Sequence, residues 1–569
     1  MKNTFIKRAL SLTAAALMLL VLAGCAGQTA SGSSNASEGT GVQATAASDD
    51  SIEAAEATGE FSISTEDGEY TRDGSTYTIT KAGAYVLTGA LTGQILVKAD
   101  EEDEVMLELA GTTITNSADS PIEILSAAKT EISAKKDTDN VVNDTRSVKT
   151  ADDDSQGAGA ITADCDLKLK GTGTLVVNAS YNNGVHTTHD LTIQKLSLKV
   201  TAVNNALKGN DSITVMSGTV VAISTNGDGL KTESTDANKY GETRGDVTVY
   251  GGSLAVCAAG DGIQAAHDFV LKADEEGNTA SVAVYTGSYS GYTSESASVD
   301  SYKGVKAENE IIISAGVIDI SSYDDGLHAN YGTTFETGEK GLGNITISGG
   351  SVKMTVYSPE NATGGGMTGP GFGGGRPGGF GGGHGGFGRQ TVSGADAIHA
   401  DGVLTISGGT VNIDSAYEGL EANVINIEGG VTVVTAVDDG VNATKGASAP
   451  AVNISGGILD VTVSPNGDTD GIDSNGTYTQ TGGLVITRGP NSRMAAALDA
   501  EGTIAVTGGT LIVLGYSRVS TGGSVKSVSL SLHSQGSHTV TIDGETYSFE
   551  NAYSYGQTIC LSSGSVSGK

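Results

Sequence analysis

Three pieces of the stretch 395–421 decide the fold: Ala-Asp-Ala-Ile-His at 395–399, Val-Leu-Thr-Ile-Ser-Gly-Gly-Thr-Val-Asn-Ile at 403–413, and Tyr-Glu-Gly-Leu-Glu at 417–421. In the middle piece, apolar and polar residues alternate on both sides of Gly-Gly, which predicts two half-buried strands joined at a corner. The outer pieces share a pattern in which a corner precedes a Gly or Ala, a branched apolar residue and a polar residue. The shared Gly or Ala is termed the anchor.

This pattern recurs along the chain, with anchors at Gly184, Ala206, Gly229, Gly262, Gly304, Gly326, Ala397, Gly419, Gly440, Gly471 and Ala497. Uninterrupted gaps between anchors are 21 to 23 residues. This period suits three short strands and their corners in each coil of a parallel β-helix. A leucine-rich repeat has a similar period, but its Leu/Asn consensus is missing, and propeller blades need about 40 residues or more. The sequence therefore predicts an all-β solenoid with about three strands per coil.

Longer gaps mark insertions. The 71-residue gap from Gly326 to Ala397 is expected to hold one further coil around Ile345 to Val352, and a run from Gly364 to Gly388 in which 16 of 25 residues are Gly. Because this run has no apolar periodicity, we predict a loop insertion at 359–390. Asp543-Gly544 lies between alternating residues of 539–548 and predicts a hairpin within a small C-terminal β cap at 515–569.

The first sixty residues predict export. Basic residues at Lys2, Lys7 and Arg8 precede an apolar run that ends at Leu22-Ala-Gly-Cys25. This resembles a lipoprotein signal peptide with a lipobox (1–25) and lipidation at Cys25; the alternative is an ordinary signal peptide with a coincidental Cys. A polar tether (26–60) and the β-helix (61–514) follow. We expect a monomer that is lipid-anchored to the outer face of the bacterial cell membrane and contacts the membrane only through that anchor.

The chain is strongly acidic. It has 569 residues, with 66 acidic and 32 basic ones, and the net charge is therefore −34. Such a charge repels nucleic acid and attracts divalent cations. Abundant Gly with little Pro and no Gly-X-Y period excludes collagen, and the composition does not fit a coiled coil.

The residues that directly precede the anchors are largely acidic or amides, and they stack about 4.8 Å apart in a β-helix. We term them the corner ladder: Asn183, Asn205, Asp228, Asp261, Lys303, Asp325, Asp396, Glu418, Asp439, Asp470 and Ala496. Oxygen donors without clustered Cys or His favour Ca²⁺. The alternative is corner chemistry alone, because Asp and Asn are common in turns.

The densest acidic segment is 466–475, whose first acids have the spacing of an EF-hand loop although the position-12 Glu is missing. The predicted metal ligands comprise this segment and other acidic corners: Asn466, Asp468, Asp470, Asp473, Asn475, Asp228, Asp261, Asp324, Asp325, Asp438 and Asp439.

The residue two positions after each anchor should point outward. We term these residues the face row: His186, Lys208, Lys231, Gln264, Lys306, His328, His399, Glu421, Asn442, Asp473 and Asp499. Since the row is polar throughout, it can hydrogen-bond sugar hydroxyls and carboxylates; the alternative is a merely soluble face. There is no Trp, and tyrosines near corners are the expected stacking partners. The predicted carbohydrate-binding residues are His186, Lys208, Lys231, Lys306, His328, His399, Tyr302, Tyr323 and Tyr417.

Several motifs carry a family resemblance. They are Gly-Ala-Tyr-Val-Leu-Thr-Gly at 83–89, Glu-Leu-Ala-Gly-Thr-Thr-Ile-Thr-Asn at 108–116, Asn-Gly-Asp-Gly-Leu at 226–230, Asp-Asp-Gly-Leu-His-Ala at 324–329 and Asp-Gly-Ile-Asp-Ser-Asn-Gly at 470–476. From about Tyr77 to Leu514 the chain resembles bacterial secreted carbohydrate-binding-domain proteins with a pectate-lyase-like right-handed parallel β-helix. The resemblance implies binding of cellulose or polygalacturonate, with Ca²⁺ in the corners and no established catalysis. Ala206, Ala397 and Ala497 depart from the usual Gly.

Three functions stay open from the sequence. The first is polysaccharide binding at the cell surface with Ca²⁺ bridging. The second is a Ca²⁺-dependent polysaccharide lyase, in which Lys208, Lys231 or Lys306 would act as the base. The third is an adhesin or structural spacer without a sugar ligand.

Overall fold

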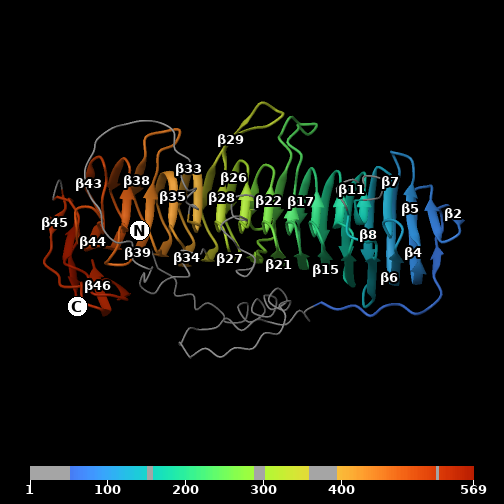
Figure 1. The fold of residues 1–569 in the computed structure, drawn as a ribbon, viewed down its shortest axis with the longest axis horizontal. Helices are drawn as coiled ribbons and strands as arrows, with labels where there is room; N and C mark the ends of the chain where they lie inside the picture. Colours follow the sequence, from blue (N-terminus) through green and yellow to red (C-terminus); the bar gives the residue numbers. More distant parts are fainter. Residues whose placement is uncertain (1–51, 150–157, 288–300, 358–393, 521–523) are drawn as a thin grey trace, which may run out of the picture.

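The computed structural model describes residues 52–149, 158–287, 301–357, 394–520 and 524–569. These residues are all-β, without a helix, and their main sheet is mostly parallel. Figure 1 shows an elongated stack in which strands run across the long axis and the chain advances from one end to the other. This arrangement is consistent with a β-helix. No helix in the described part of the chain is long and apolar enough to cross a membrane.

Each coil contributes strands to three stacks of parallel strands. The first stack contains β3 (Thr76–Ile79), β5 (Gln94–Lys98), β7 (Ile122–Ser126), β10 (Gly159–Ala163), β13 (Asn183–Thr187), β16 (Leu207–Gly209), β19 (Leu230–Lys231), β22 (Ile263–Ala265), β25 (Val305–Ala307), β28 (Leu327–Ala329), the first part of β33 (Ile398–Ile406) and of β35 (Leu420–Ile427), β37 (Val441–Ala443) and β40 (Ile472–Ser474).

The second stack follows directly along the chain. It contains the first parts of β4 (Gly83–Thr92) and β6 (Glu104–Asn116), then β8 (Lys129–Ala134), β11 (Asp166–Gly171), β14 (Asp190–Gln194), β17 (Ser212–Val215), β20 (Asp246–Val249), β23 (Phe269–Leu271), β26 (Glu310–Ile313), β31 (Asn344–Ile347), the later parts of β33 and β35, β38 (Ala451–Ile454), β41 (Thr477–Gln480) and β43 (Ile504–Val506).

The third stack leads back to the corner ladder. It contains the later parts of β4 and β6, then β9 (Asp139–Asp144), β12 (Thr174–Ala179), β15 (Leu196–Ala202), β18 (Gly218–Ser224), β21 (Gly252–Ala258), β24 (Ala280–Thr286), β27 (Val317–Ser322), β32 (Ser351–Val356), β34 (Thr410–Ser415), β36 (Val431–Thr435), β39 (Ile458–Thr462), β42 (Leu484–Arg488) and β44 (Thr510–Leu514).

The core consists of rows of inward-facing side chains, with one row for each inward position of the repeat. In β14, Leu191 and Ile193 are buried while the residues between and beside them are not, which is the period-2 alternation expected of a strand with one buried face. Each inward residue lies beside its equivalent in the next coil; Leu191 pairs with Ile213 of β17. The inward positions thus merge into one continuous apolar cluster along most of the stack.

Gly326 to Ala397 forms a single coil, and the expectation of a further coil in this gap was wrong. Strand β28 pairs directly with β33, and β31 and β32 are the second and third strands of that same coil. The extra length comes from the hairpin β29 (Tyr331–Thr334) and β30 (Lys340–Leu342) and from residues 358–393, which include the predicted Gly-rich loop and lie outside the described residues. Length alone could not distinguish an added coil from insertions within one coil.

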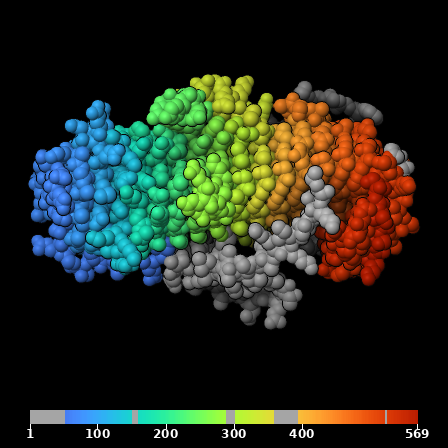
Figure 2. All heavy atoms as spheres, turned by 180° about the vertical axis from the view of Figure 1, so that it is seen from behind, coloured from blue at the N-terminus to red at the C-terminus, as the bar shows by residue number. Residues whose placement is uncertain are grey.

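A second insertion, between β19 and β20, projects beside this hairpin (Figures 1 and 2). The Glu336 amide donates a hydrogen bond to the Thr235 carbonyl at 3.0 Å, and the hydroxyls of Thr243 and Thr337 lie 2.9 Å apart. The two insertions therefore support each other on one side of the stack.

The two ends depart from the coil pattern. At the N-terminal end, β1 (Ser62–Ser64) pairs antiparallel with β4, and β2 (Tyr70–Asp73) pairs antiparallel with β3. Ile52 packs on Val176, Val221 and Ala255 of the third stack. The predicted signal peptide, Cys25 and the tether up to residue 51 lie outside the described residues.

At the C-terminal end, β48 (Thr558–Ser562) pairs antiparallel with β44 and with β45 (Lys526–Ser527). Strands β46 (Gly536–Ile542), β47 (Glu545–Asn551) and β49 (Val566–Gly568) form a separate antiparallel sheet. Asp543 and Gly544 have φ values of 50° and 92° and join β46 to β47, which confirms the predicted hairpin. The domain boundaries at 60 and 514 stay predictions.

The anchors pack against the third stack of their own coil. A Cβ on Gly184 or Gly229 would lie 2.1 Å from a methyl of Val200 or Val256, respectively. The register places Ala222 at the equivalent position of the intervening coil, whose anchor is Ala206. A smaller partner thus accommodates the larger anchor.

We predict that Gly229→Ala lowers the free energy of unfolding by about 1–3 kcal/mol, because the added methyl overpacks the contact with Val256. Adding Val256→Ala recreates the Ala206–Ala222 pair, and the double variant should lose less stability than the sum of the single variants. Urea denaturation measures all three. Simple additivity would show that the anchor does not pack against this side chain.

Candidate functional site

The face row is continuous on the outer side of the first stack. Neighbouring members pair in register from coil to coil, from His186 with Lys208 at one end to Asn442 with Asp473 at the other. From Lys208 to Asp473 the members are half-buried and lie between buried residues, whereas His186 is 9% exposed and Asp499, also half-buried, lies outside the strands. The prediction that this position faces outward is therefore confirmed for the row from Lys208 to Asp473.

The corner ladder lies beside the face row and is hydrogen-bonded along its length. At most of its links, a side-chain oxygen of one member accepts a hydrogen bond from the backbone N–H of the equivalent residue in the next coil. The Asp261 amide donates to Asp228 Oδ1 at 2.9 Å, the Lys303 amide to Asp261 Oδ1 at 2.8 Å and the Asp470 amide to Asp439 Oδ1 at 2.7 Å. The Asp and Asn residues therefore have a structural role that uses only one of the two terminal atoms of the side chain.

In the first half of the row, lysines pair with the remaining carboxylate oxygens. Lys231 Nζ lies 3.0 Å from Asp228, and Lys303 Nζ lies 3.0 Å from Asp324 and 2.8 Å from Asp325. Lys208 and Lys306 pair in the same way with Glu233 and Glu308, at 2.8 and 3.0 Å. Each lysine considered as a lyase base therefore contacts a carboxylate and would have to leave it to accept a proton.

These ion pairs offset the unfavourable free energy of burying the charged carboxylates. Burial alone would raise the pKa of Asp325, but the Lys303 ammonium and His328 hold that pKa well below its usual range. Asp261 lies beside Asp228 without such a cation, and burial together with that neighbour raises its pKa to about 6.

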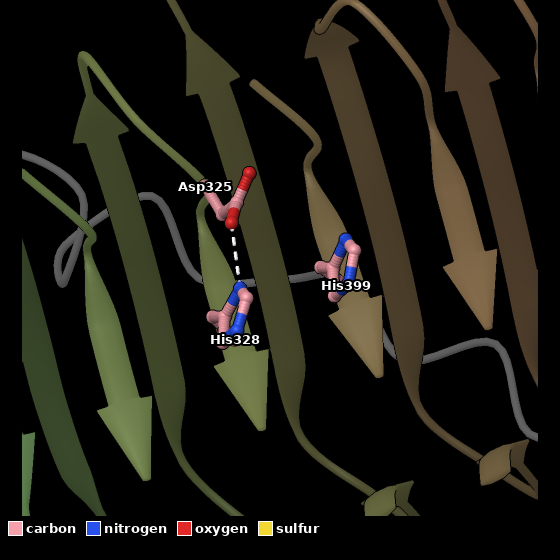
Figure 3. Close-up of side chains that lie close together, drawn as sticks. All are labelled: Asp325, His328 and His399. Atoms are coloured by element: carbon pink, nitrogen blue, oxygen red, sulfur yellow. Dashed lines mark hydrogen bonds and ion pairs between the residues drawn. The ribbon is translucent and has the colours of Figure 1, made fainter. Parts of the chain in front are cut away.

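Two histidines occupy the middle of the row. His328 and His399 are paired in register on β28 and β33, and their rings stack with centroids 4.6 Å apart and an interplanar angle of 7°. Figure 3 shows the two imidazoles side by side below Asp325, whose Oδ2 lies 2.6 Å from His328 Nδ1. His399 Nδ1 lies 2.9 Å from both Asp396 Oδ2 and Glu421 Oε2.

The last part of the row is acidic. Asp439, Asp470 and Asp473 each offer an oxygen within 4.8 Å of the other two. Burial and the neighbouring carboxylates raise the pKa of Asp439 to about 8 and that of Asp470 to about 7. Among the described residues, no Lys, Arg or His forms an ion pair with these three carboxylates, unlike those in the first half.

The other predicted ligands of this segment lie apart from that group. Asn466 and Asp468 are exposed. The side-chain amide of Asn475 donates through Nδ2 to the Ala443 carbonyl at 3.3 Å. Asp438 is half-buried, and burial raises its pKa. Of the segment 466–475, the structure thus brings together Asp470 and Asp473 with Asp439 of the preceding coil.

Tyrosines line the corner between the third stack and the ladder. Tyr323 lies between Tyr285 and Tyr357, with ring centroids at 6.4 and 5.4 Å. Tyr302 is half-buried in the same corner as Tyr285, where its carbonyl accepts a hydrogen bond from the Thr286 hydroxyl, and Tyr417 is half-buried at the corner of a later coil. Tyr285 and Tyr357 were not predicted. Tyr357 directly follows β32, as Tyr323 follows β27, whereas Tyr285 lies within β24 and pairs with Ser321.

Asp396, Asp401 and Glu421 were also missed as site residues. The signal was present: Asp-Gly-Leu-His-Ala-Asn at 325–330 and Asp-Ala-Ile-His-Ala-Asp at 396–401 are two copies of one motif. A separate cleft of about 500 Å³ lies over the second stack, lined in part by Asp190, Asp211, Tyr240 and Arg244. None of the predicted binding residues lines it.

Residues 73–356 match a family model described as carbohydrate-binding domain-containing protein. A curated protein of that description from Acetivibrio thermocellus is 40% identical over 126 residues, which are 22% of this chain and 44% of that protein. Residues 73–356 belong to the carbohydrate-binding domain-containing protein family. The predicted family is thereby confirmed.

The chain spans less than half of the length of that relative. A solved structure of a polysaccharide lyase-like protein from C. thermocellum, a gadolinium derivative, is 33% identical and covers 45% of this chain and 90% of its own, with a TM-score of 0.36. The residues that match the family model include the first six members of the face row, from His186 to His328.

For the ladder of this carbohydrate-binding domain, we expect Asp228→Ala to lower the free energy of unfolding by about 1–3 kcal/mol, since the buried Asp261 amide loses its acceptor. Asp228→Asn should cost less, because Asn205 already accepts the Asp228 amide at 3.0 Å one coil earlier. Urea denaturation compares the two. Equal losses would mean that the charge on Asp228, paired with Lys231, matters more than the ladder hydrogen bond.

Proposed function

We propose that this protein binds a cell-wall-type polysaccharide, either cellulose or a polygalacturonate-like chain, along the face row. The observation that carries the proposal is the register of that row, in which each coil presents one polar side chain beside the next. A polysaccharide repeats its hydroxyls or carboxylates at regular intervals, and a regular row of donors and acceptors can bind several sugars at once. The carbohydrate-binding family supports this class of ligand.

The tyrosine corner is the second element of the proposed site. Tyr285, Tyr323 and Tyr357 come from three successive coils and adjoin the ladder through the turn at Asp324. Tyr357 is 41% exposed. Tyrosine faces stack on the apolar faces of sugar rings, which compensates for the absence of Trp.

We further propose that Asp439, Asp470 and Asp473 hold Ca²⁺. Three converging carboxylates without a protein cation fit an ion that prefers six to eight oxygen ligands. Bound Ca²⁺ would supply the positive charge that an acidic sugar requires on a protein of net charge −34. Asn466, Asp468 and Asn475, and the acidic corners Asp228, Asp261, Asp324, Asp325 and Asp438, stay predicted ligands.

The setting of the site is part of the proposal. We infer right-handed coils, because about 98% of connections between parallel strands of one sheet are right-handed. Residues 1–25 support export and lipidation at Cys25, which would hold a monomeric binding domain on the outer face of the cell membrane.

If Asp439, Asp470 and Asp473 bind Ca²⁺, chelator should lower the melting temperature of the wild-type protein. A ligand that binds only the native state at a hundredfold excess over its Kd adds about 2.7 kcal/mol. Asp470→Asn combined with Asp473→Asn should remove most of this sensitivity, whereas the exposed control Glu428→Gln should keep it. Calorimetry with and without Ca²⁺ measures the effect. If apo and Ca²⁺-treated wild type melt at the same temperature, these carboxylates serve only to form the turns and do not bind Ca²⁺.

For the ligand, we expect affinity electrophoresis in polygalacturonate to retard the wild-type protein, more strongly with Ca²⁺. Tyr357→Ala should weaken binding about 2- to 10-fold, equivalent to roughly 0.5–1.5 kcal/mol for one ring. Tyr240→Ala is the matched control, since Tyr240 is exposed but lies at the separate cleft. Retardation in neither polygalacturonate nor soluble cellulose derivatives would favour the spacer function instead.

A further inference from the structure

The two histidines of the face row belong to a repeated motif. Asp325, His328 and Asn330 recur one coil later as Asp396, His399 and Asp401, and the two strands pair in register. The second copy has an additional partner, because Glu421 of the following coil pairs with His399 in the row. The stack therefore places two imidazoles and four carboxylates within a span of three coils.

Both imidazoles are held at both nitrogens. His328 Nε2 lies 2.7 Å from Asn330 Oδ1, and His399 Nε2 lies 3.2 Å from Asp401 Oδ1. Nε2–H donates to this oxygen acceptor, and Nδ1 is directed at a ladder carboxylate, to which its own N–H donates unless a metal ion replaces that proton. Metal-binding histidines have this arrangement, in which the second nitrogen donates to a carboxylate or carbonyl and fixes the tautomer and the ring orientation.

The ligand atoms converge at His399 Nδ1. Asp396, His399 and Glu421 each offer an atom within 4.8 Å of the other two, and Asp325, His328 and His399 do the same. His399 is common to both groups. At this nitrogen two carboxylates face a single imidazole, and the Asp396 side chain is only 6% exposed.

The charges of the two copies differ. Lys303 compensates Asp325 in the first copy, with Nζ 2.8 Å from Oδ2. In the second copy, no Lys or Arg among the described residues pairs with Asp396 or Glu421.

We propose that His399, Asp396 and Glu421, with His328 beside them, bind a divalent transition metal ion of the Zn²⁺ type. Imidazole nitrogen together with carboxylate oxygen suits Zn²⁺, Co²⁺, Ni²⁺ or Cu²⁺ better than Ca²⁺, which takes oxygen ligands. His399 is about a quarter exposed, and the ion can therefore enter from solvent and keep a position open toward a bound ligand. This site is separate from the Ca²⁺ group proposed at Asp439, Asp470 and Asp473.

The test uses the purified full chain, freed of metal by chelator and titrated with Co²⁺ by visible absorption and with Zn²⁺ by calorimetry. We expect a saturable Co²⁺ spectrum with nitrogen-ligand character, displaced by Zn²⁺ but not by excess Ca²⁺. His399→Gln should abolish this signal and Glu421→Gln should weaken it. Asp401→Asn, which changes the partner of His399 Nε2 and the acceptor of the Tyr331 amide, should lower the affinity about 10- to 100-fold.

Two variants serve as matched controls. His186→Gln changes a histidine of the same row that forms no ion pair with a carboxylate in the described part of the chain. His267→Gln changes the histidine of another His/Asp group, which Phe335 covers at a ring distance of 5.0 Å. Both should bind Co²⁺ as the wild type does. Circular dichroism and thermal melting establish that each variant is folded.

Loss of binding in folded His267→Gln but not in His399→Gln would place the ion elsewhere and overturn the proposal. So would a wild-type protein that binds no Co²⁺, because His399 would then be an imidazolium held by its carboxylates. Retention of Ca²⁺-dependent melting in His399→Gln would separate this site from the acidic end of the row.

Discussion

Parallel backbone pairing between successive coils is the interaction on which the rest of the structure depends. Every strand of a stack bonds to the equivalent strand one coil later, and each position of the repeat therefore becomes a row. Inward positions such as Leu191 and Ile213 merge into a continuous core, whereas outward positions become a line of functional groups. A coil cannot bury its apolar face alone, and the stability of each coil thus depends on its neighbours.

The corner ladder shows how this repetition manages acidic residues. In the ladder hydrogen bonds, a carboxylate or amide oxygen accepts a backbone N–H from the next coil. Where it forms, that bond satisfies a backbone amide and leaves the second carboxylate oxygen for another partner. The partner is an ammonium at Asp228 and Asp325, and Asp396 one coil later pairs with an imidazole.

The same scaffold therefore supports three chemical environments along one row. Lysine–carboxylate pairs occupy the first half, two stacked imidazoles the middle, and carboxylates without a protein cation the end at Asp439, Asp470 and Asp473. A long ligand that runs along the row would meet all three. Substitution at a single repeat position changes the charge of the side chain and its softness as a metal ligand, while the backbone stays the same.

The sequence by itself determined the repeat, the alternation of inward and outward residues, the outward face of the row and the terminal hairpin at Asp543-Gly544. These features follow from local periods and turn residues, which act within one coil. It did not determine that Gly326 to Ala397 is one coil, because a long gap between anchors can arise either from insertions within one coil or from an added coil. Nor did it show that Glu421 joins Asp396 at His399, or that Ala206 has Ala222 as its register partner. These contacts join residues of different strands or successive coils, and only the coil-to-coil register of the tertiary structure decides them.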